Sequence, residues 1–413
     1  MKNSERDTFE QRRKLLGGLG ALGVAAFAIP SLGRAAESGM VELPFVNGTR
    51  ELTSAFPQKR DLILQRTRPP LLETPWEVFD KGVFTPNDRF YVRWHLANTP
   101  ASIDPTAFRL AIRGQVNKTV SLTLNDLVKK FARFEIAAVN QCSGNSRGFF
   151  SPRVPGGQWG NGGMGNALWS GVRLKDVLEY AGVRSNAVQV RFNGLDSGVI
   201  PQTPKFMKSL AMDHALDGEV MIAYAMNGEA LPLLNGYPLR LVVPGWYATY
   251  WVKMLNDIEV LDKPDDNFWT AKAYTIPDNH FANIHPGETD VKMVPINKML
   301  PRSFFTNLNA GATVNAGQPT QVRGIAFGGF NALKKVQFSA NGGQSWNDAQ
   351  LGQDHGRYSF RQWHTTVNFS QPGKQVLMVR AVDSTGEVQP STPNWNGAGF
   401  MRNVIESVDI NVA

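Results

Sequence analysis

The chain's one cysteine stands in a segment whose residue types could bind a metal or a substrate. Cys142 follows an apolar run, residues 136–139, that predicts a short buried strand, and it precedes a turn rich in Gly, Asn and Ser. A thiol where a strand gives way to a loop can act as a metal ligand or a nucleophile. Arg147, five residues on, could stabilise a thiolate or a bound anion. A buried structural cysteine is the alternative that this segment alone leaves open.

Two further segments carry groups that suit an oxyanion. Residues 90–95 predict a strand in which alternation puts Arg93 and His95 on the same face, although a solvated strand edge has the same pattern. Arg240 and Lys253 flank a predicted buried strand and could hold a phosphate, or could be surface charges.

The elements predicted around these residues are those of an α+β domain. Thr123 with Asp126 indicates the start of a helix that runs to Lys130. Residues 239–245 predict a buried strand that ends in a Pro-Gly turn. A second helix is indicated by an apolar face and a glycine stop, which are Leu174, Val177, Leu178 and Gly182.

The segments before and after this domain differ from it in composition and in sequence pattern. Residues from 37 to about 90 are Pro-rich and predict an irregular wrapping segment without a core of its own. Residues 262–295 predict a linker, in which the aromatic residue Tyr274 could be an interface residue. From about residue 296, short β segments with regular turns, including a hairpin at 336–346, indicate an immunoglobulin-like sandwich. It shows no catalytic constellation, so we interpret it as structural.

The N-terminus predicts an export signal. Arg12 and Arg13 precede a mildly apolar, Gly- and Ala-rich stretch that ends in small residues, which is typical of a twin-arginine signal over residues 1–36. The stretch is too short and glycine-rich for a convincing membrane span, so we expect a periplasmic protein with no span after processing. The twin-arginine route carries folded proteins, often with a cofactor already inserted.

The net charge and the cysteine count argue against several classes of partner and of covalent or metal site. Residues 1–36 hold six Lys and Arg against three Asp and Glu, so their removal lowers the net charge from +8 to +5. No Lys/Arg run stands out, which argues against a nucleic-acid partner. With one cysteine, the chain can form neither an intramolecular disulfide, nor a c-type haem attachment, nor an iron–sulfur cluster held by several cysteines.

Three motifs together resemble the sulfite oxidase family of molybdopterin enzymes. They are Cys-x-Gly-Asn-x-Arg at 142–147, Gly-Asn-Ala-x-Trp-x-Gly-Val-x-Leu at 165–174 and Asn-Gly-Tyr-Pro-Leu-Arg-Leu-Val-Val-Pro-Gly at 235–245. The resemblance covers residues from about 40 to 413 and is strongest to the catalytic subunits of bacterial periplasmic sulfite dehydrogenases. It implies a molybdopterin-binding domain at 37–285 and an immunoglobulin-like dimerisation domain at 286–413.

The resemblance also implies roles for single residues. Cys142 matches the cysteine whose thiolate binds molybdenum, and Arg93, Arg147 and Tyr274 match the sulfite pocket. The residues that match cofactor contacts are Tyr91, Val92, Arg93, Trp94, His95, Cys142, Asp196, Asn235, Arg240, Trp251, Val252 and Lys253. Asn235 is a departure, because vertebrate-type members have histidine there, but an amide can also donate and accept hydrogen bonds.

The implied activity is oxidation of sulfite to sulfate at a molybdenum–molybdopterin centre. Since this sequence has no c-type haem motif, the implied electron acceptor is a separate c-type cytochrome. The chain would form either a heterodimer with that cytochrome or a homodimer that passes electrons to it. A sulfur-oxidation complex component of the same family is an alternative. A methionine sulfoxide reductase of the same fold would lack the C-terminal sandwich. A cysteine hydrolase using His95 and a secreted binding protein are the alternatives from other classes.

Overall fold

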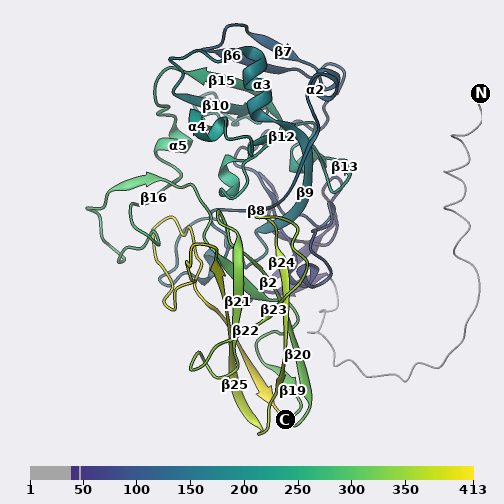
Figure 1. Ribbon diagram of the computed structural model, residues 1–413, viewed down its shortest axis with the longest axis vertical. Helices are drawn as coiled ribbons and strands as arrows, with labels where there is room; N and C mark the ends of the chain where they lie inside the picture. The colour runs from purple at the N-terminus through teal and green to yellow at the C-terminus, as the bar shows by residue number, and fades with distance from the viewer. Residues whose placement is uncertain (1–38, 46–47) are drawn as a thin grey trace, which may run out of the picture. The chain divides into compact units, whose positions relative to one another are not determined.

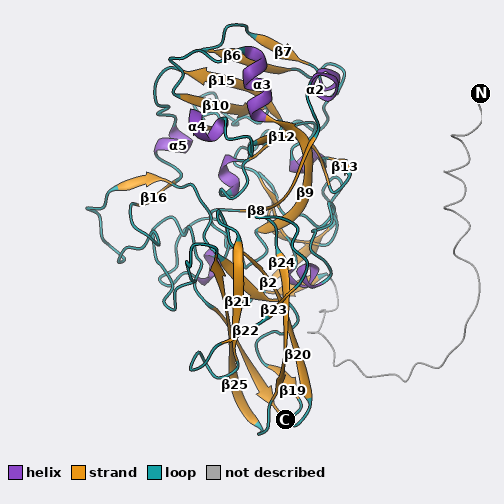
Figure 2. Ribbon diagram, viewed as in Figure 1, coloured by secondary structure: helices purple, strands orange, loops and turns teal. Residues whose placement is uncertain are grey.

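The computed structural model describes residues 39–45 and 48–413, so the predicted signal at 1–36 lies outside the described residues. The described chain is mostly strands and loops with a few short helices (Figure 2). The predicted α+β class is confirmed. The α-helices are α2 (Leu124–Lys130), α3 (Leu174–Ala181), α4 (Met212–Ala215) and α5 (Phe268–Ala271), and the 3-10 helices are η2 (Trp76–Asp80), η3 (Arg147–Phe149), η4 (Leu233–Asn235) and η5 (Ala248–Tyr250).

The N-terminal segment folds into a sheet, so the prediction of an irregular segment over residues 37–90 is wrong. Its five strands, joined in sequence order, are β1 (Met40–Glu42), β2 (Thr49–Thr53), β3 (Leu62–Arg66), β4 (Leu71–Glu73) and β5 (Val92–Arg93). Each strand has only two to five residues, too few for a clear alternation in the sequence. Leu62, Leu72, Val92 and Trp94 share a small core with residues of the following domain.

Two sheets form the centre of residues 37–285, the predicted cofactor-binding domain, which we call the catalytic part. The first has the order β11 (Met207–Ala211), β10 (Gln189–Gly194), β15 (Leu255–Leu261), β6 (Leu110–Gly114) and β7 (Val120–Leu122). The second has the order β13 (Glu229–Ala230), β12 (Met221–Met226), β9 (Met164–Arg173) and β8 (Phe134–Gln141), with β14 (Arg240–Val242) paired to β12. The predicted strands before Cys142 and before the Pro-Gly turn are confirmed as β8 and β14.

Both predicted helices are confirmed by their ends. Thr123 and Asp126 form a reciprocal capping box at the start of α2, and Gly182 ends α3 with φ of 72°. The predicted linker at 262–295 contains more structure than expected, because β16 (Thr275–Pro277) pairs with β17 (Met293–Pro295) after α5.

The C-terminal residues form two facing sheets, as predicted. One has the order β18 (Arg302–Phe305), β20 (Pro319–Phe327), β24 (Arg361–Asn368) and β23 (Gln350–Leu351); the other has β19 (Ala312–Val314), β26 (Glu406–Val412), β25 (Gly373–Asp383), β21 (Leu333–Ser339) and β22 (Asn347–Asp348). The predicted hairpin is confirmed as β21 and β22. The two sheets enclose a core of their own that includes Val322, Trp363 and Leu377.

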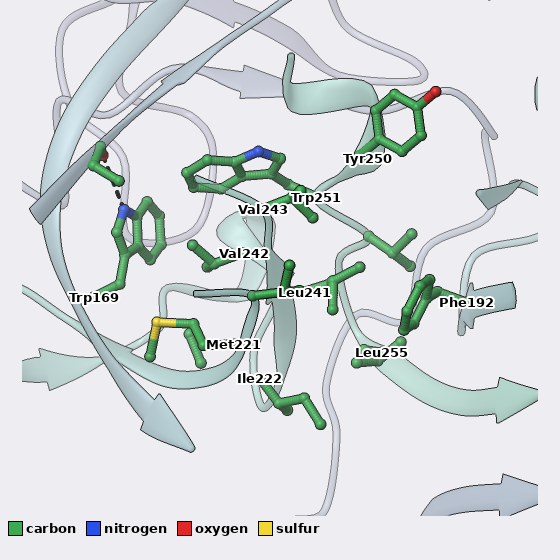
Figure 3. Close-up of a cluster of buried hydrophobic side chains, with 14 of the residues drawn as sticks. Trp169, Phe192, Met221, Ile222, Leu241, Val242, Val243, Tyr250, Trp251 and Leu255 are labelled. Carbon is green, nitrogen blue, oxygen red and sulfur yellow. Dashed lines mark hydrogen bonds between the residues drawn. The ribbon is translucent and has the colours of Figure 1, made fainter. Parts of the chain in front are cut away.

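The largest hydrophobic cluster lies in the catalytic part and extends into the C-terminal domain. Figure 3 shows a portion of it, where Trp169 and Trp251 lie beside the strand that carries Leu241 and Val242. Trp169 donates its indole N–H to the carbonyl of Ala138 over 3.0 Å. Among the described residues, no helix is both long and apolar enough to cross a membrane.

Candidate active site

A polar cavity opens where five separate parts of the chain meet. They are β5 with its flanking residues, the end of β8 with the loop after it, Phe206 just before β11, the segment from η4 to β15, and Tyr274 just before β16. Its lining residues are Tyr91, Arg93, His95, Asn140, Cys142, Ser143, Phe206, Leu234, Asn235, Arg240, Ala248, Thr249, Lys253 and Tyr274. Of the fourteen residues proposed from the sequence, the cavity brings together Tyr91, Arg93, His95, Cys142, Asn235, Arg240, Lys253 and Tyr274.

Alternation along β5 decides which of its residues face the cavity. Tyr91, Arg93 and His95 line it, whereas Val92 and Trp94 pack into the small core of the N-terminal sheet. The side chains of Val92 and Trp94 therefore lie away from the cavity. His95 stands beyond the two-residue strand but keeps its alternation.

The loop that carries Cys142 is tied to the chain around it by backbone hydrogen bonds. The Cys142 N–H donates to the Gly163 carbonyl over 2.9 Å, and the Asn145 N–H donates to the Cys142 carbonyl over 2.9 Å. The thiol is buried, with 7% of the residue exposed. It is the one cysteine of the chain, and it faces the cavity.

Arg147 is buried beside this loop rather than in the cavity wall. Its Nε donates to the Ala398 carbonyl over 3.1 Å, and its Nη1 donates to the Gly157 carbonyl over 3.2 Å. A Cβ on Gly144 would lie 2.3 Å from Arg147 Nη2, which explains why the motif needs glycine at that position. Burial lowers the pKa of Arg147, while the Cys142 and Tyr274 charges act in the opposite direction.

Arg240 and Lys253 supply buried positive charge on the other side of the cavity. Arg240 donates to the carbonyl of Asn235 over 3.0 Å, and burial lowers its pKa to about 10. Burial also lowers the pKa of Lys253, to which the Arg240 charge contributes. Asp196, outside the lining, opposes that shift through its negative charge, while burial raises the pKa of Asp196 itself.

Trp251 and Val252 act on the cavity through Arg240 and its strand. The Trp251 carbonyl accepts a hydrogen bond from Arg240 over 3.4 Å, and the Val252 carbonyl accepts one from the Leu241 N–H over 2.8 Å. The Arg240 guanidinium also lies over the Trp169 ring at 4.9 Å. Neither Trp251 nor Val252 lines the cavity, so both position the residues that do.

His95 and Tyr274 form a hydrogen-bonded pair at the cavity. The His95 ring stacks on Phe206 at a centroid distance of 3.8 Å, and its Nε2 is hydrogen-bonded to the Tyr274 hydroxyl. Burial, together with the Arg93 and Lys253 charges, holds the pKa of His95 well below its ordinary value. Burial raises the pKa of Tyr274. At neutral pH the pair is therefore an uncharged imidazole and an intact phenol.

The polar atoms of the cavity are suited to an anionic ligand. Among the described residues, six that line it have a buried side-chain atom without a hydrogen-bond partner: Arg93 Nη1, Asn140 Nδ2, Ser143 Oγ, Asn235 Oδ1, Arg240 Nε and Thr249 Oγ1. Unsatisfied buried polar atoms are costly, so their concentration in one place indicates a ligand that satisfies them. The described residues that line the cavity include two arginines and a lysine but neither Asp nor Glu.

Asn235 contributes a hydrogen-bond acceptor to the cavity. Its Nδ2 donates to the Tyr91 carbonyl over 3.1 Å, which leaves Oδ1 facing the cavity as an acceptor. Six cavity residues escaped sequence reasoning, namely the polar residues Asn140, Ser143 and Thr249 and the apolar residues Phe206, Leu234 and Ala248. Asn140 and Ser143 adjoin the Cys142 motif, so proximity to it could have indicated them, whereas no local signal marks Thr249.

Comparison with known proteins agrees with this geometry. The family model described as "Oxidoreductase molybdopterin binding domain" matches residues 95–269, and that described as "Mo-co oxidoreductase dimerisation domain" matches residues 294–413. Sulfite oxidase of Gallus gallus is 33% identical over 84% of this chain and 77% of its own length. Mitochondrial sulfite oxidase of Rattus norvegicus is 32% identical over 85% of this chain, which spans 66% of that relative's length.

A solved structure supports the fold over nearly the whole chain. The sulfane dehydrogenase SoxCD of Paracoccus pantotrophus superimposes with a TM-score of 0.72 at 24% identity, covering 95% of this chain and 96% of that one. By its two domains, its cavity and its relatives, the chain belongs to the sulfite oxidase family of molybdopterin enzymes.

Proposed function

We propose that the chain is the catalytic subunit of a sulfite dehydrogenase, which oxidises sulfite to sulfate and passes electrons one at a time to a separate c-type cytochrome. The observation that carries the proposal is the cationic cavity, which concentrates partnerless buried polar atoms beside the one cysteine. The molybdenum–molybdopterin group, when bound there, supplies the oxygen-atom transfer and the two-electron redox change that sulfite oxidation needs.

The cavity residues divide between cofactor and substrate. The soft thiolate of Cys142 is the proposed molybdenum ligand. Arg240 and Lys253 provide the charge, and Asn235 a hydrogen-bond acceptor, for the pterin and its phosphate. Asp196 balances the charge of Lys253 from outside the lining.

Sulfite is a small anion, and two guanidinium groups are available to bind it. Arg93 faces the cavity with a partnerless Nη1, and Arg147 is buried beside the Cys142 loop. Each can hold a sulfite oxygen by a charge-assisted hydrogen bond. The Tyr274 hydroxyl can hydrogen-bond the substrate and move a proton at its oxygen, with the His95 imidazole as its partner.

The cellular setting is part of the proposal. The twin-arginine pattern at 1–36 supports export to the periplasm with the cofactor already inserted. The sequence lacks a c-type haem motif, which supports a separate cytochrome acceptor. The match to a family model named for dimerisation supports a homodimer or a complex with the cytochrome.

A second candidate is a component of a sulfur-oxidation complex that acts on bound sulfane sulfur. The fold likeness to a sulfane dehydrogenase, over 95% of the chain, favours it. The two candidates differ in substrate, so the purified protein should be assayed with free sulfite and with carrier-bound sulfane sulfur. Turnover of carrier-bound sulfur without turnover of sulfite would favour the second candidate.

Elemental analysis together with a cytochrome assay tests the main proposal. We expect about one molybdenum per chain and sulfite-dependent reduction of cytochrome c. Cys142→Ser should leave the fold intact and abolish turnover, because a hydroxyl is a harder ligand that stays protonated. Full activity in a metal-free protein would refute the proposal, and wild-type turnover in Cys142→Ser would remove Cys142 as the ligand.

A further inference from the structure

One turn of the C-terminal domain, residues 394–401, reaches the side chains that surround the cavity. Two asparagines fasten it. Asn394 Nδ2 donates to the carbonyls of Phe281 and Phe400 over 3.0 and 3.1 Å, and Asn396 Nδ2 donates to those of Ala282 and Phe400 over 2.8 and 3.0 Å. The Phe400 N–H returns a hydrogen bond to Asn396 Oδ1 over 3.0 Å. The backbone of Phe400 is therefore held in one position.

The same turn packs closely on Arg147. The Ala398 carbonyl accepts the hydrogen bond from Arg147 Nε. A Cβ on Gly399, whose φ is +63°, would lie 2.8 Å from Arg147 Cγ and 2.9 Å from Nε, so the turn needs glycine there. The Arg147 guanidinium carbon lies 5.3 Å from the centre of the Phe400 ring, within the range of a cation–π contact.

The Phe400 ring also contacts Tyr274, a second candidate sulfite-binding residue. It stacks on the Tyr274 ring at a centroid distance of 5.3 Å and an interplanar angle of 5°. Next to it, the Met401 N–H donates to the Ser143 carbonyl over 3.1 Å, one residue from Cys142. The Phe400 ring thus touches both Arg147 and Tyr274, and the backbone next to Phe400 is hydrogen-bonded to the cysteine loop.

We propose that Phe400 is a positioning residue for substrate binding, and that the C-terminal domain thereby takes part in the active site. Phe400 does not line the cavity, so it acts by fixing the Arg147 guanidinium relative to the Tyr274 hydroxyl. Its backbone is set by the asparagine hydrogen bonds, so the side chain alone can be changed. The inference rests on the proposed oxidation of sulfite at this cavity.

Phe400→Leu in the full-length holoenzyme tests the proposal. The ring contacts to Arg147 and Tyr274 are lost, so we expect kcat/KM for sulfite to fall roughly ten- to a hundred-fold, mainly through KM. Molybdenum content should stay at the wild-type level. Phe400→Tyr keeps the ring and should restore most of the loss.

A matched control separates positioning from stability. Phe369 is the same residue type in the same domain and is also 6% exposed, but it packs in the separate core of the sandwich. Phe369→Leu should lower the melting temperature while leaving KM unchanged. Equal KM values for Phe400→Leu, Phe369→Leu and the wild type would overturn the proposal.

A crystal structure of Phe400→Leu gives an outcome that does not depend on the reaction. The proposal expects the Arg147 guanidinium or the Tyr274 ring to be displaced, and unchanged positions of both would overturn it. Displacement in the variant combined with a wild-type protein that contains molybdenum but does not turn over sulfite would instead overturn the proposed function alone.

Discussion

Tyr274 differs from the other candidate catalytic residues because its chemistry resides in one hydroxyl. That hydroxyl is hydrogen-bonded to His95, and the ring is held by Phe400. Tyr274→Phe should keep the ring packed while removing the proposed hydrogen bond to sulfite. Loss of a hydrogen bond to a charged group costs ~1.5–3 kcal/mol, so kcat/KM should fall roughly ten- to a hundred-fold.

Steady-state kinetics across pH measure this effect. Tyr250→Phe is the control, because it removes another buried hydroxyl, which donates to the Ile296 carbonyl over 2.6 Å outside the cavity. If Tyr274→Phe matched the wild type at every pH, Tyr274 would be only an aromatic contact. The assignment of Cys142 would then stand unaffected.

Lys208 is a buried ionisable residue that sequence reasoning did not identify. Its ammonium donates to the Trp269 carbonyl over 3.0 Å and lies 5.3 Å from the centre of the Tyr274 ring. Burial lowers its pKa to about 7. In the unfolded chain the same group stays protonated up to about pH 10.5. Between pH 7 and 10.5 the unfolded state thus binds more protons, so stability rises with pH.

Lys208→Met tests this linkage, because methionine has a similar length and does not titrate. The free energy of unfolding of the wild type should gain about 1–3 kcal/mol relative to the variant between pH 7 and pH 9. Equilibrium denaturation at the two pH values measures the difference. A constant difference would show that Lys208 remains charged in the folded protein.

At this scale the sequence predicted the residue types better than their partners. Alternation placed Arg93 and His95 on one face, and the cysteine motif identified Arg147. The pattern could not show that Arg147 lies against a turn of the C-terminal domain, because that contact joins residues 251 positions apart. Thr249 and Lys208 have no local signal, since only the folded chain brings them to the site.

Among the elements, the N-terminal sheet places a second arginine on the face that carries Arg93. Arg66 on β3 pairs with Leu71 on β4, which pairs with Arg93 on β5, so the three side chains share one face. Burial and then the Arg93 charge lower the pKa of Arg66. Arg66 is nevertheless exposed, so its charge can attract anions from solution toward Arg93.

Arg66→Gln should therefore slow capture of sulfite. We expect kcat/KM to fall several-fold at low ionic strength and to approach the wild-type value at high salt, because salt screens exposed charges. Arg60→Gln is the control, as Arg60 is exposed but paired with Asp88 at 3.4 Å. Parallel salt dependences for wild type and Arg66→Gln would exclude a steering role.

The elements that the sequence predicted are those with local signals. The capping box of α2, the glycine stop of α3 and the hairpin of β21 and β22 each lie within a few residues of the chain. The N-terminal sheet was not predicted because its strands are short. Its last strand, β5, pairs with β4 only after a long connection that contains proline. Such pairing depends on tertiary contacts that periodicity does not reveal.

For the whole molecule, the main feature is a core that two predicted domains share. Phe304, Phe327 and Phe360 of the C-terminal domain belong to the same cluster as Trp169 of the catalytic part. The Val139 N–H of β8 donates to the Tyr358 carbonyl over 2.8 Å, three residues before Cys142. The short β segments and regular turns of the sequence predicted a separate structural domain. Sequence composition cannot show that one face of this domain also covers the core of the catalytic part.

Deletion of residues 286–413 should therefore do more than prevent the proposed dimerisation. It would expose the apolar side chains that Phe304, Phe327 and Phe360 now cover. Full burial of one large apolar side chain contributes about 1.5–3 kcal/mol to stability. It would also remove the turn that holds Arg147. We expect the remaining catalytic part to aggregate or unfold and to retain no molybdenum.

Light scattering, circular dichroism and elemental analysis of the truncated and full-length proteins measure this outcome. The full-length protein should be a folded dimer that contains molybdenum, and its Phe369→Leu variant controls for a merely weakened sandwich core. A truncated chain that is monomeric, folded and loaded with molybdenum would show that the shared cluster is dispensable. A truncated chain that still dimerises would place the interface in the catalytic part, because the sandwich would no longer be there to form it.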